Sequence, residues 1–349
     1  MAYAGFLRVL PTPTATLSGF VCLLNAGWFT QADASALDGT TFINGGGSLR
    51  IYTDATKTTQ LPLEVVTFVT GITPEVQAWV RIPTYTGAAT TVWVESDAVA
   101  IAQPAVGAAF GRNAVWSDYE SVIHDGSTLD STGNRSITVV NAPTIVAGVN
   151  GDASLYDGTN DAIYLDATGL NILGGFSISA FLKSSGVTSF DRIVHIVNGD
   201  GNIQLVSNSG TASYVYAGNT GVSAGNGVGR NSGGASGATE YIQSGSTTPT
   251  TGKQVYIDGV SSVSSSSAWT VSTNLNRIYI GSRSDNSSFF NGSIEELRIA
   301  EVLFSVDHDS STLLNVTNAS TFGTSSGWTT GGGGGFQSAW ARNSNYMIQ

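Results

Sequence analysis

The sequence has very little of the chemistry that catalytic and metal-binding proteins use. Its 349 residues include one cysteine, Cys22, and three histidines that lie far apart, with no ligand spacing typical of zinc. A single cysteine excludes an internal disulfide. Only 11% of the residues are charged, whereas ordinary soluble domains have about 25%. Neutral polar side chains therefore make up most of the expected surface.

Positive charge is scarcer than negative charge. Lys and Arg total 14 and Asp and Glu total 25, which gives a net charge of -11. Nucleic-acid binding depends on clusters of basic side chains, and none is present, so nucleic acid is not expected as a partner.

Long apolar runs are also missing. The stretch "FVCLLNAGWF" (residues 20–29) is too short to span a bilayer, and no basic segment precedes it as in a signal peptide. We therefore predict a strand here, no membrane insertion, and synthesis in the cytoplasm.

No segment has the pattern of a long amphipathic helix. Instead, short runs rich in Val, Ile, Thr, Tyr and Trp recur, each bounded by turn residues: "SLRIYTD", "LEVVTFV", "VQAWVRI" and "TTVWVES". A strand with one apolar face needs a second sheet to cover it. The sequence therefore predicts an all-β protein with two antiparallel β-sandwich or jelly-roll domains.

Composition divides the chain into three parts. Residues 100–114 lose the strand pattern, so we place a domain at 1–104 and a second at 112–310. Within the second, the Gly- and Ser-rich stretches 218–238 and 261–268 are predicted to be loops. Residues 311–349 carry one charged side chain and five consecutive glycines, which predicts a Gly-rich C-terminal arm.

The second part contains motifs in a characteristic order. The stretches "VYIDGV", "LNRIYIGSR" and "FNGSIEELRIAEVLFS" follow "DSTGN", "ASLYDGTNDAIYLD" and "FSISAFLKS". This series resembles the laminin-G-like, concanavalin A-like lectin domain over most of residues 115–306, although Phe181 stands where many relatives carry Trp. The resemblance implies that the second sandwich is concanavalin A-like. The Asp258-Gly259 pair independently predicts a tight hairpin.

The first part has a resemblance of its own. Residues 15–97 are similar to a β domain of unknown function that often stands directly before a concanavalin A-like domain. This pair occurs in bacterial envelope proteins and bacteriophage structural proteins. It implies display on a surface and no reaction.

Catalysis on this fold would require two carboxylates about 5 to 9.5 Å apart, as in glycoside hydrolases. The nearest candidates are Glu295 and Glu296, but adjacent residues of a regular strand point to opposite faces. We therefore expect no enzyme. His124 is predicted to be structural, and Glu296 and Arg298 are expected to pair.

Two candidate ligand sites remain. Some laminin-G-like domains bind calcium, and "DGTND" offers Asp157, Asn160 and Asp161 as oxygen ligands, although an ion-free turn is favoured. No other cofactor is expected. Aromatic platforms for sugars could come from Tyr214, Tyr216 and Trp269, with half-buried sheet surface as the alternative for the tyrosines.

The arm is rich in aromatic residues but nearly uncharged, so it should cover a surface. We expect Phe336, Trp340 and Tyr346 to dock on another copy or another virion protein. The alternative is that the arm folds back on the second domain.

These features favour a non-enzymatic bacteriophage virion structural protein: a capsid decoration, head-fibre or tail-associated component. It would be a homo-oligomer, made in the host cytoplasm and located on the virion surface. Its partners would be other virion proteins, copies of itself and host-surface glycans bound by the lectin-like domain. The alternatives are a secreted extracellular adhesin or glycan-binding lectin and, third, a glycoside hydrolase.

Overall fold

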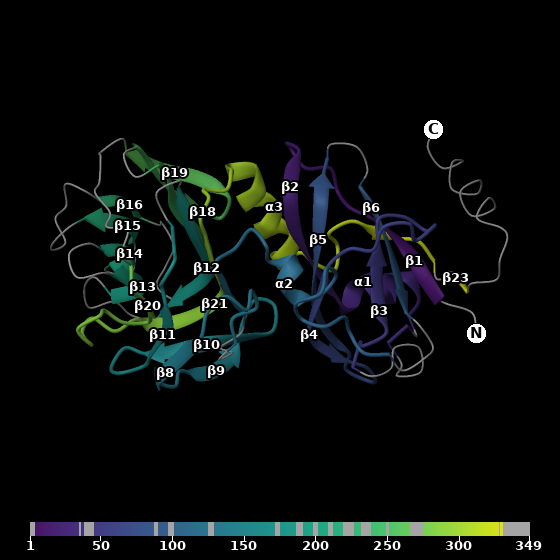
Figure 1. Cartoon of the computed structure of the whole chain (residues 1–349), viewed down its shortest axis with the longest axis horizontal. Coiled ribbons are helices and arrows are strands. Elements are labelled where there is room, and N and C mark those ends of the chain that lie inside the picture. The colour runs from purple at the N-terminus through teal and green to yellow at the C-terminus, as the bar shows by residue number, and fades with distance from the viewer. Residues whose placement is uncertain are drawn as a thin grey trace.

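Two β-sandwiches lie side by side in the computed structural model, with short helices between them (Figure 1). The structure describes residues 4–34, 36–37, 45–86, 90–96, 101–124, 129–171, 175–185, 191–197, 202–208, 212–218, 227–231, 239–248, 251–265, 275–327 and 329–330. Every pair of named strands in it is antiparallel, so the all-β prediction is confirmed. None of the helices in these ranges is long and apolar enough to cross a membrane.

The first sandwich pairs a three-stranded sheet, in the order β2-β5-β4, with a five-stranded sheet in the order β22-β1-β6-β3, in which β23 also pairs with β1. The four runs predicted as strands in this region are confirmed as β3 to β6. The bounds are β1 Ala4–Val9, β2 Leu17–Asn25, β3 Leu49–Tyr52, β4 Leu63–Val69, β5 Glu75–Tyr85, β6 Thr91–Ser96, β22 Thr324–Ser325 and β23 Thr329–Thr330.

The apolar stretch 20–29 is a strand only in its first half. Helix α1 (Ala26–Ala32) begins after Asn25, whose side chain accepts a hydrogen bond from the backbone N–H of Gly27 at 3.0 Å. An asparagine in this N-cap position favours a helix start. Trp28 and Phe29 are fully buried on the helix. The prediction of one continuous strand was therefore wrong, because the cap and this packing outweigh the strand propensity of the aromatic residues.

Strand β2 is continuously apolar from Phe20 to Leu24 because both of its faces are buried there. Phe20 and Cys22 point into the core of the first sandwich, whereas Val21 and Leu23 join a second apolar cluster with residues of the other sandwich. A sheet that is covered on both faces gives a continuous hydrophobic run instead of alternation.

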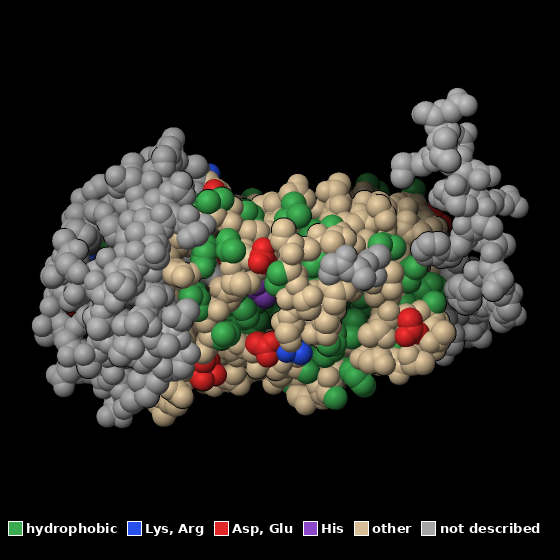
Figure 2. All heavy atoms as spheres, turned by 90° about the horizontal axis from the view of Figure 1, so that it is seen from above, with side chains coloured by type: hydrophobic (Ala, Val, Ile, Leu, Met, Phe, Trp, Pro, Cys, Tyr) green, Lys and Arg blue, Asp and Glu red, His purple; other side chains and the backbone are tan. Residues whose placement is uncertain are grey.

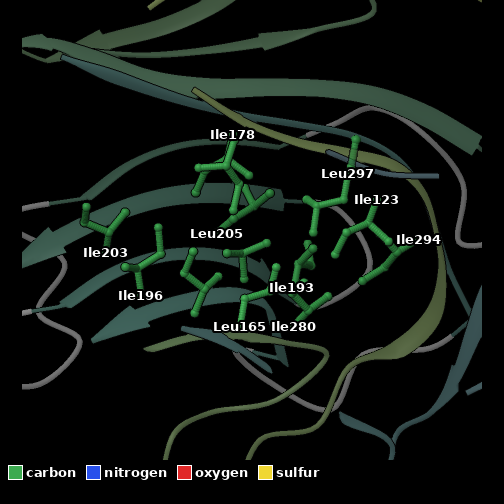
Figure 3. Packing of buried hydrophobic residues seen from close by; sticks show 14 of the residues in the cluster. Ile123, Leu165, Ile178, Ile193, Ile196, Ile203, Leu205, Ile280, Ile294 and Leu297 are labelled. Atoms are coloured by element: carbon green, nitrogen blue, oxygen red, sulfur yellow. The ribbon is translucent and has the colours of Figure 1, made fainter. Parts of the chain in front are cut away.

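The second sandwich contains a seven-stranded sheet, in the order β16-β15-β14-β13-β20-β11-β8, and an eight-stranded sheet, in the order β19-β18-β17-β12-β21-β10-β9 with β7 paired to β21. Figure 3 shows aliphatic side chains from the two sheets, such as Ile178 and Ile196, filling the space between them. The bounds are β7 Ser121–Ile123, β8 Ile137–Asn141, β9 Thr144–Ala147, β10 Asp152–Asp157, β11 Ala162–Asp166, β12 Phe176–Ser184, β13 Asp191–Val197, β14 Asn202–Asn208, β15 Ala212–Gly218, β16 Gly227–Asn231, β17 Thr239–Thr248, β18 Thr251–Ile257, β19 Val260–Ser265, β20 Arg277–Ile280 and β21 Asn291–Ala300.

The hairpin between β18 and β19 has the predicted two-residue turn. Asp258 and Gly259 have φ of +49° and +73°, and Ile257 pairs directly with Val260. Two central residues with positive φ define the tight turn that suits a twisted hairpin. The stretch 261–268 that follows was predicted to be a loop, but its residues up to Ser265 belong to edge strand β19; residues 266–268 lie outside the described ranges. Strand β16 likewise lies inside the Gly-rich stretch 218–238, because ladder hydrogen bonds need only backbone groups.

Strand β21 contains a bulge at Glu296. This residue has φ of +53°, and the pairing with β12 shifts there, from Phe181 opposite Glu295 to Ser179 opposite Arg298. The extra residue changes the alternation, as bulges do. Both glutamates and Arg298 consequently lie on the outer face, while the isoleucine and leucine neighbours all enter the core. The expected opposite orientation of Glu295 and Glu296 was therefore wrong.

The C-terminal part returns to the first sandwich instead of forming an arm. Helix α3 (Val306–Thr317) lies between the two sandwiches, where the Asn315 side chain accepts a hydrogen bond from the N–H of Leu23 at 2.7 Å. Phe322 is then buried in the first core, and β22 pairs with β1. The expected arm at 311–349 is thus wrong as far as Thr330. Phe336, Trp340 and Tyr346 lie outside the described residues.

Candidate functional site

A row of polar and aromatic residues crosses the seven-stranded sheet. Its ladder places Tyr164 opposite Tyr279, Tyr279 opposite His195, and His195 opposite Gln204. The neighbours of these residues along their strands are core residues. Because successive strand residues point to opposite faces, the row lies on the outer face of the sheet. This face is on the side of the second sandwich away from the first (Figure 1).

The two tyrosines at one end of the row form an aromatic surface. Their ring centroids are 5.9 Å apart, and both side chains are half-buried. The exposed Arg277 guanidinium lies 4.6 Å from the centroid of the Tyr164 ring, and its Nη1 donates to the Tyr279 hydroxyl at 3.4 Å. Two rings and a cation therefore share one accessible patch, which we call the tyrosine platform (Tyr164, Tyr279 and Arg277).

His195 follows Tyr279 in the row and precedes Gln204. It is buried, and its Nδ1 accepts a hydrogen bond from the N–H of Ser284 at 3.1 Å. Burial, and then the charges of Arg192 and Arg283, lower the pKa of His195 to about 3. The ring is therefore neutral at pH 7. Its Nε2 lies 3.2 Å from the side-chain nitrogen of Gln204, so the two side chains are in contact across the ladder.

The sequence-predicted ligand residues lie partly in this sheet. The ladder pairs Tyr216 of β15 with Gln204, which extends the row by one strand, and pairs Tyr214 with Val206. The side chains of both tyrosines lie outside the described part of the structure, as does Trp269. Sequence reasoning missed Tyr164 and Tyr279, although each stands at the polar-face position of an alternating strand, "AIYLD" and "RIYI".

The candidate calcium cluster forms a hydrogen-bonded turn. Asp157 Oδ1 accepts hydrogen bonds from the N–H groups of Thr159 and Asn160 at 2.7 and 3.1 Å, and these two bonds lower the pKa of Asp157. Asp161 Oδ2 in turn accepts from the N–H of Asp157 at 2.9 Å. These are the contacts of an Asx turn. Over the described ranges, no group of three or more His, Cys, Asp or Glu side chains could hold a metal ion.

Glu295 and Glu296, the nearest pair of candidate catalytic carboxylates, are buried on the outer face of β21. Glu295 accepts hydrogen bonds from the N–H groups of Val149 and Asn150 at 2.5 and 2.7 Å. Glu296 instead accepts one from Gln77 of the first sandwich at 3.1 Å. Only 3% and 1% of their surfaces are exposed, so neither carboxylate faces an open groove.

A charged cluster joins the sandwiches at this point. His124 places Nδ1 2.8 Å from Glu296 and Nε2 3.1 Å from Glu64 of the first sandwich. Burial, the largest single contribution, lowers the pKa of His124, but the two carboxylates together raise it to about 10. The imidazole is therefore charged at neutral pH. Arg298 completes the cluster at 3.1 Å from Glu296, which confirms the expected pair.

Tryptophan rings enclose this cluster. His124 stacks on Trp79 with centroids 5.6 Å apart and an interplanar angle of 9°. The Arg298 guanidinium lies 4.6 Å from Trp79 and 5.1 Å from Trp116. Both ring systems are fully buried. The cluster thus fixes the two sandwiches to each other, and His124 is structural as predicted.

Comparison with known families identifies the second sandwich. Residues 157–308 match the concanavalin A-like lectin/glucanases superfamily. This match confirms the concanavalin A-like domain that the motifs implied. A comparison with curated protein sequences finds no significant match.

Several solved structures are similar to part of this chain. The binding domain of botulinum neurotoxin DC in complex with SialylT is 11% identical, with a TM-score of 0.46, over 57% of this chain and 52% of that one. The same domain in complex with rat synaptotagmin II is 10% identical, with a TM-score of 0.47, over 59% of this chain and 52% of that one. Domain 4 of AbnA, a GH43 extracellular arabinanase from Geobacillus stearothermophilus, in complex with arabinotriose, is 21% identical, with a TM-score of 0.41, over 56% of this chain and 98% of that one. The chain spans about half the length of the neurotoxin domains.

Proposed function

We propose that this protein is a non-enzymatic carbohydrate-binding protein and that the tyrosine platform is part of its binding surface. The observation that carries the proposal is the pair of half-buried tyrosines beside exposed Arg277 on the outer sheet face. The superfamily match over residues 157–308 supports it.

The platform has the groups that a sugar ring requires. The C–H faces of a sugar can pack on the rings of Tyr164 and Tyr279, and its hydroxyls can accept hydrogen bonds from Arg277. The Gln204 amide lies beside His195 in the same row. An open sheet face shares its polar contacts with water, so each site should bind weakly. Several copies on one particle would compensate through avidity.

We further propose that the protein is located on a bacteriophage virion, as a capsid decoration, head-fibre or tail-associated component. The seven-stranded sheet, whose outer face carries the platform, lies on the side of the second sandwich away from the first (Figure 1). The first sandwich can therefore attach to other virion proteins while the platform meets host glycans. Among the described residues that Figure 2 colours, charged side chains are few and scattered on the face in view, which suits close packing in an assembly. Mass spectrometry of purified particles tests this location, and a protein found only in particle-free medium would instead be a secreted adhesin.

A glycan array with the multimerised full chain tests carbohydrate binding. We expect Tyr279→Ala to weaken binding about tenfold, which corresponds to about 1.4 kcal/mol, because it removes half of the aromatic surface. Tyr52→Ala is the matched control, since Tyr52 is a half-buried tyrosine in β3 of the first sandwich. Melting temperatures establish that both variants are folded.

Two outcomes would contradict the proposal. If the protein binds no glycan on the array while a control lectin does, a structural role alone remains. Equal glycan binding by the wild type and Tyr279→Ala would place the sugar site elsewhere on the chain.

A further inference from the structure

A pocket of about 370 Å³ opens where the two sandwiches meet. Its walls come from three parts of the chain: strand β4 of the first sandwich, the linker between the domains, and the segment that follows β7 in the second sandwich. Its volume is in the range of small-molecule sites, which often lie at domain junctions. It is separate from the tyrosine platform, which lies on the opposite sheet of the second sandwich.

The solvent-exposed part of the pocket lining is largely apolar. Val106 of the linker and Leu129 of the second sandwich are 54% and 49% exposed, and Val65 and Val66 of β4 are half-buried beside them. Large aliphatic side chains that converge on one opening leave apolar surface in water. A ligand with an apolar body would cover that surface.

The charges on the floor of the pocket neutralise one another. Glu64 Oε1 accepts a hydrogen bond from the Ser131 hydroxyl at 2.7 Å, and its Oε2 lies 3.1 Å from Nε2 of His124. This carboxylate also accepts a hydrogen bond from Trp116 Nε1. Glu64 therefore has partners for both oxygens and a cation beside it, and it is a poor site for a positively charged ligand.

Arg112 is the remaining charged residue of the lining. Its only hydrogen bond within the described residues runs from Nε to Asn113 Oδ1 at 3.4 Å, and it forms no ion pair in those ranges. With Glu64 balanced by His124, the described lining has one net positive charge. A guanidinium binds a carboxylate well because two of its N–H groups can donate in parallel.

We propose that the pocket binds a small organic anion with an apolar body. The anionic group pairs with Arg112 at the rim, and the body packs against Val65, Val106 and Leu129. A medium-chain carboxylate has this chemistry. Since the walls come from both sandwiches and from the linker, such a ligand also bridges the two domains.

Titration of the full chain with octanoate, followed by NMR of labelled Val and Leu methyl groups, tests the proposal. We expect saturable shifts concentrated on Val106, Leu129 and their neighbours. Arg112→Gln should weaken octanoate binding about tenfold, as expected for loss of one charge-assisted contact. Arg277→Gln is the control, because it removes an exposed arginine from the tyrosine platform and should leave octanoate binding unchanged.

Octanamide, which has the same chain without the charge, tests selectivity for anions. It should bind the wild type about as weakly as octanoate binds Arg112→Gln. Three results would overturn the proposal: no saturable shift at the pocket, equal binding of octanoate by the wild type and Arg112→Gln, or equal binding of octanoate and octanamide by the wild type.

Discussion

At the scale of single residues, His124 shows how a scarce residue type can control an interface. It is one of three histidines in the chain, and it contacts one buried carboxylate from each sandwich. An isolated buried carboxylate is very unfavourable unless a cation accompanies it. The charged imidazole therefore makes the approach of Glu64 and Glu296 possible.

Replacement of His124 with Gln should destabilise the protein by about 3 kcal/mol or more, because Glu64 loses the cation beside it. Urea denaturation at pH 7 measures the change. His195→Gln is the matched control, because His195 is a buried neutral histidine that contacts Gln204 and the backbone of Ser284 instead of carboxylates. An equal loss in the two variants would contradict a special role for the charge of His124.

The same residue predicts a dependence on pH. Folding raises the pKa of His124 from 6.5 to about 10, so folding favours its charged form. Its stabilising contribution is complete below pH 6.5 and is lost as the pH rises to about 10. Burial also raises the pKa of Asp309, to about 8, so the window from pH 8 to 10 is the informative one. There the wild type should lose more unfolding free energy than His124→Gln, and parallel curves would refute this.

At the scale of elements, the segment after α3 completes the first sandwich. Phe322 lies 6.3 Å from Phe20 and 6.4 Å from Tyr85 between ring centroids. Arg8 of β1 donates to the Phe322 carbonyl at 2.7 Å and stacks over Trp28 at 4.5 Å. The buried arginine thus finds acceptors for its Nη1 and Nη2 groups in the returning segment, at Ser325 and Phe322.

Phe322→Ala should cost about 3 to 5 kcal/mol, the usual loss when a buried aromatic side chain is truncated. Leu314→Ala is the control, because Leu314 is 48% exposed on α3 and its truncation should change stability by less than about 0.5 kcal/mol. Chemical denaturation of both variants measures the difference. Similar stabilities would mean that the segment adds nothing to the first core.

At the scale of the whole molecule, the two sandwiches should unfold as one unit. Trp79 and Trp116 pack edge to face at 5.5 Å, within an apolar cluster that includes β2, β12, β17 and α3. This interface holds buried charges as well as apolar surface. Either sandwich alone would expose both to water, which couples their stabilities.

Trp116→Ala should therefore separate a single thermal transition into two, as measured by calorimetry on the full chain. The truncation removes the ring between His124 and Tyr119 and leaves each core intact. Ile278→Ala is the control, because it lies within the second core and should lower stability without separating the transitions. Two transitions in the wild type would show that the interface does not couple the domains.

The sequence by itself determined several strands of the first sandwich and much of the second fold. Short runs rich in β-branched and aromatic residues predicted β3 to β6 to within three residues at either end, because these residue types favour strands and the turn residues around them end each run. The Asp258-Gly259 pair predicted its hairpin, since few residues accept two positive φ angles in succession. The ordered motifs predicted the concanavalin A-like domain. These signals are local, so each can be recognised without knowledge of distant contacts.

Only the tertiary structure decided the contacts between distant segments. The bulge at Glu296 places Glu295 and Glu296 on the same face of the sheet, whereas regular alternation would place them on opposite faces. One additional residue shifts every later position, and no local pattern marks it. Tyr164 and Tyr279 become one platform only when β11 and β20 pair. The partners of His124 lie 60 and 172 residues away along the chain. Such contacts depend on how whole sheets pack, and that packing decided where the charges, the platform and the pocket lie.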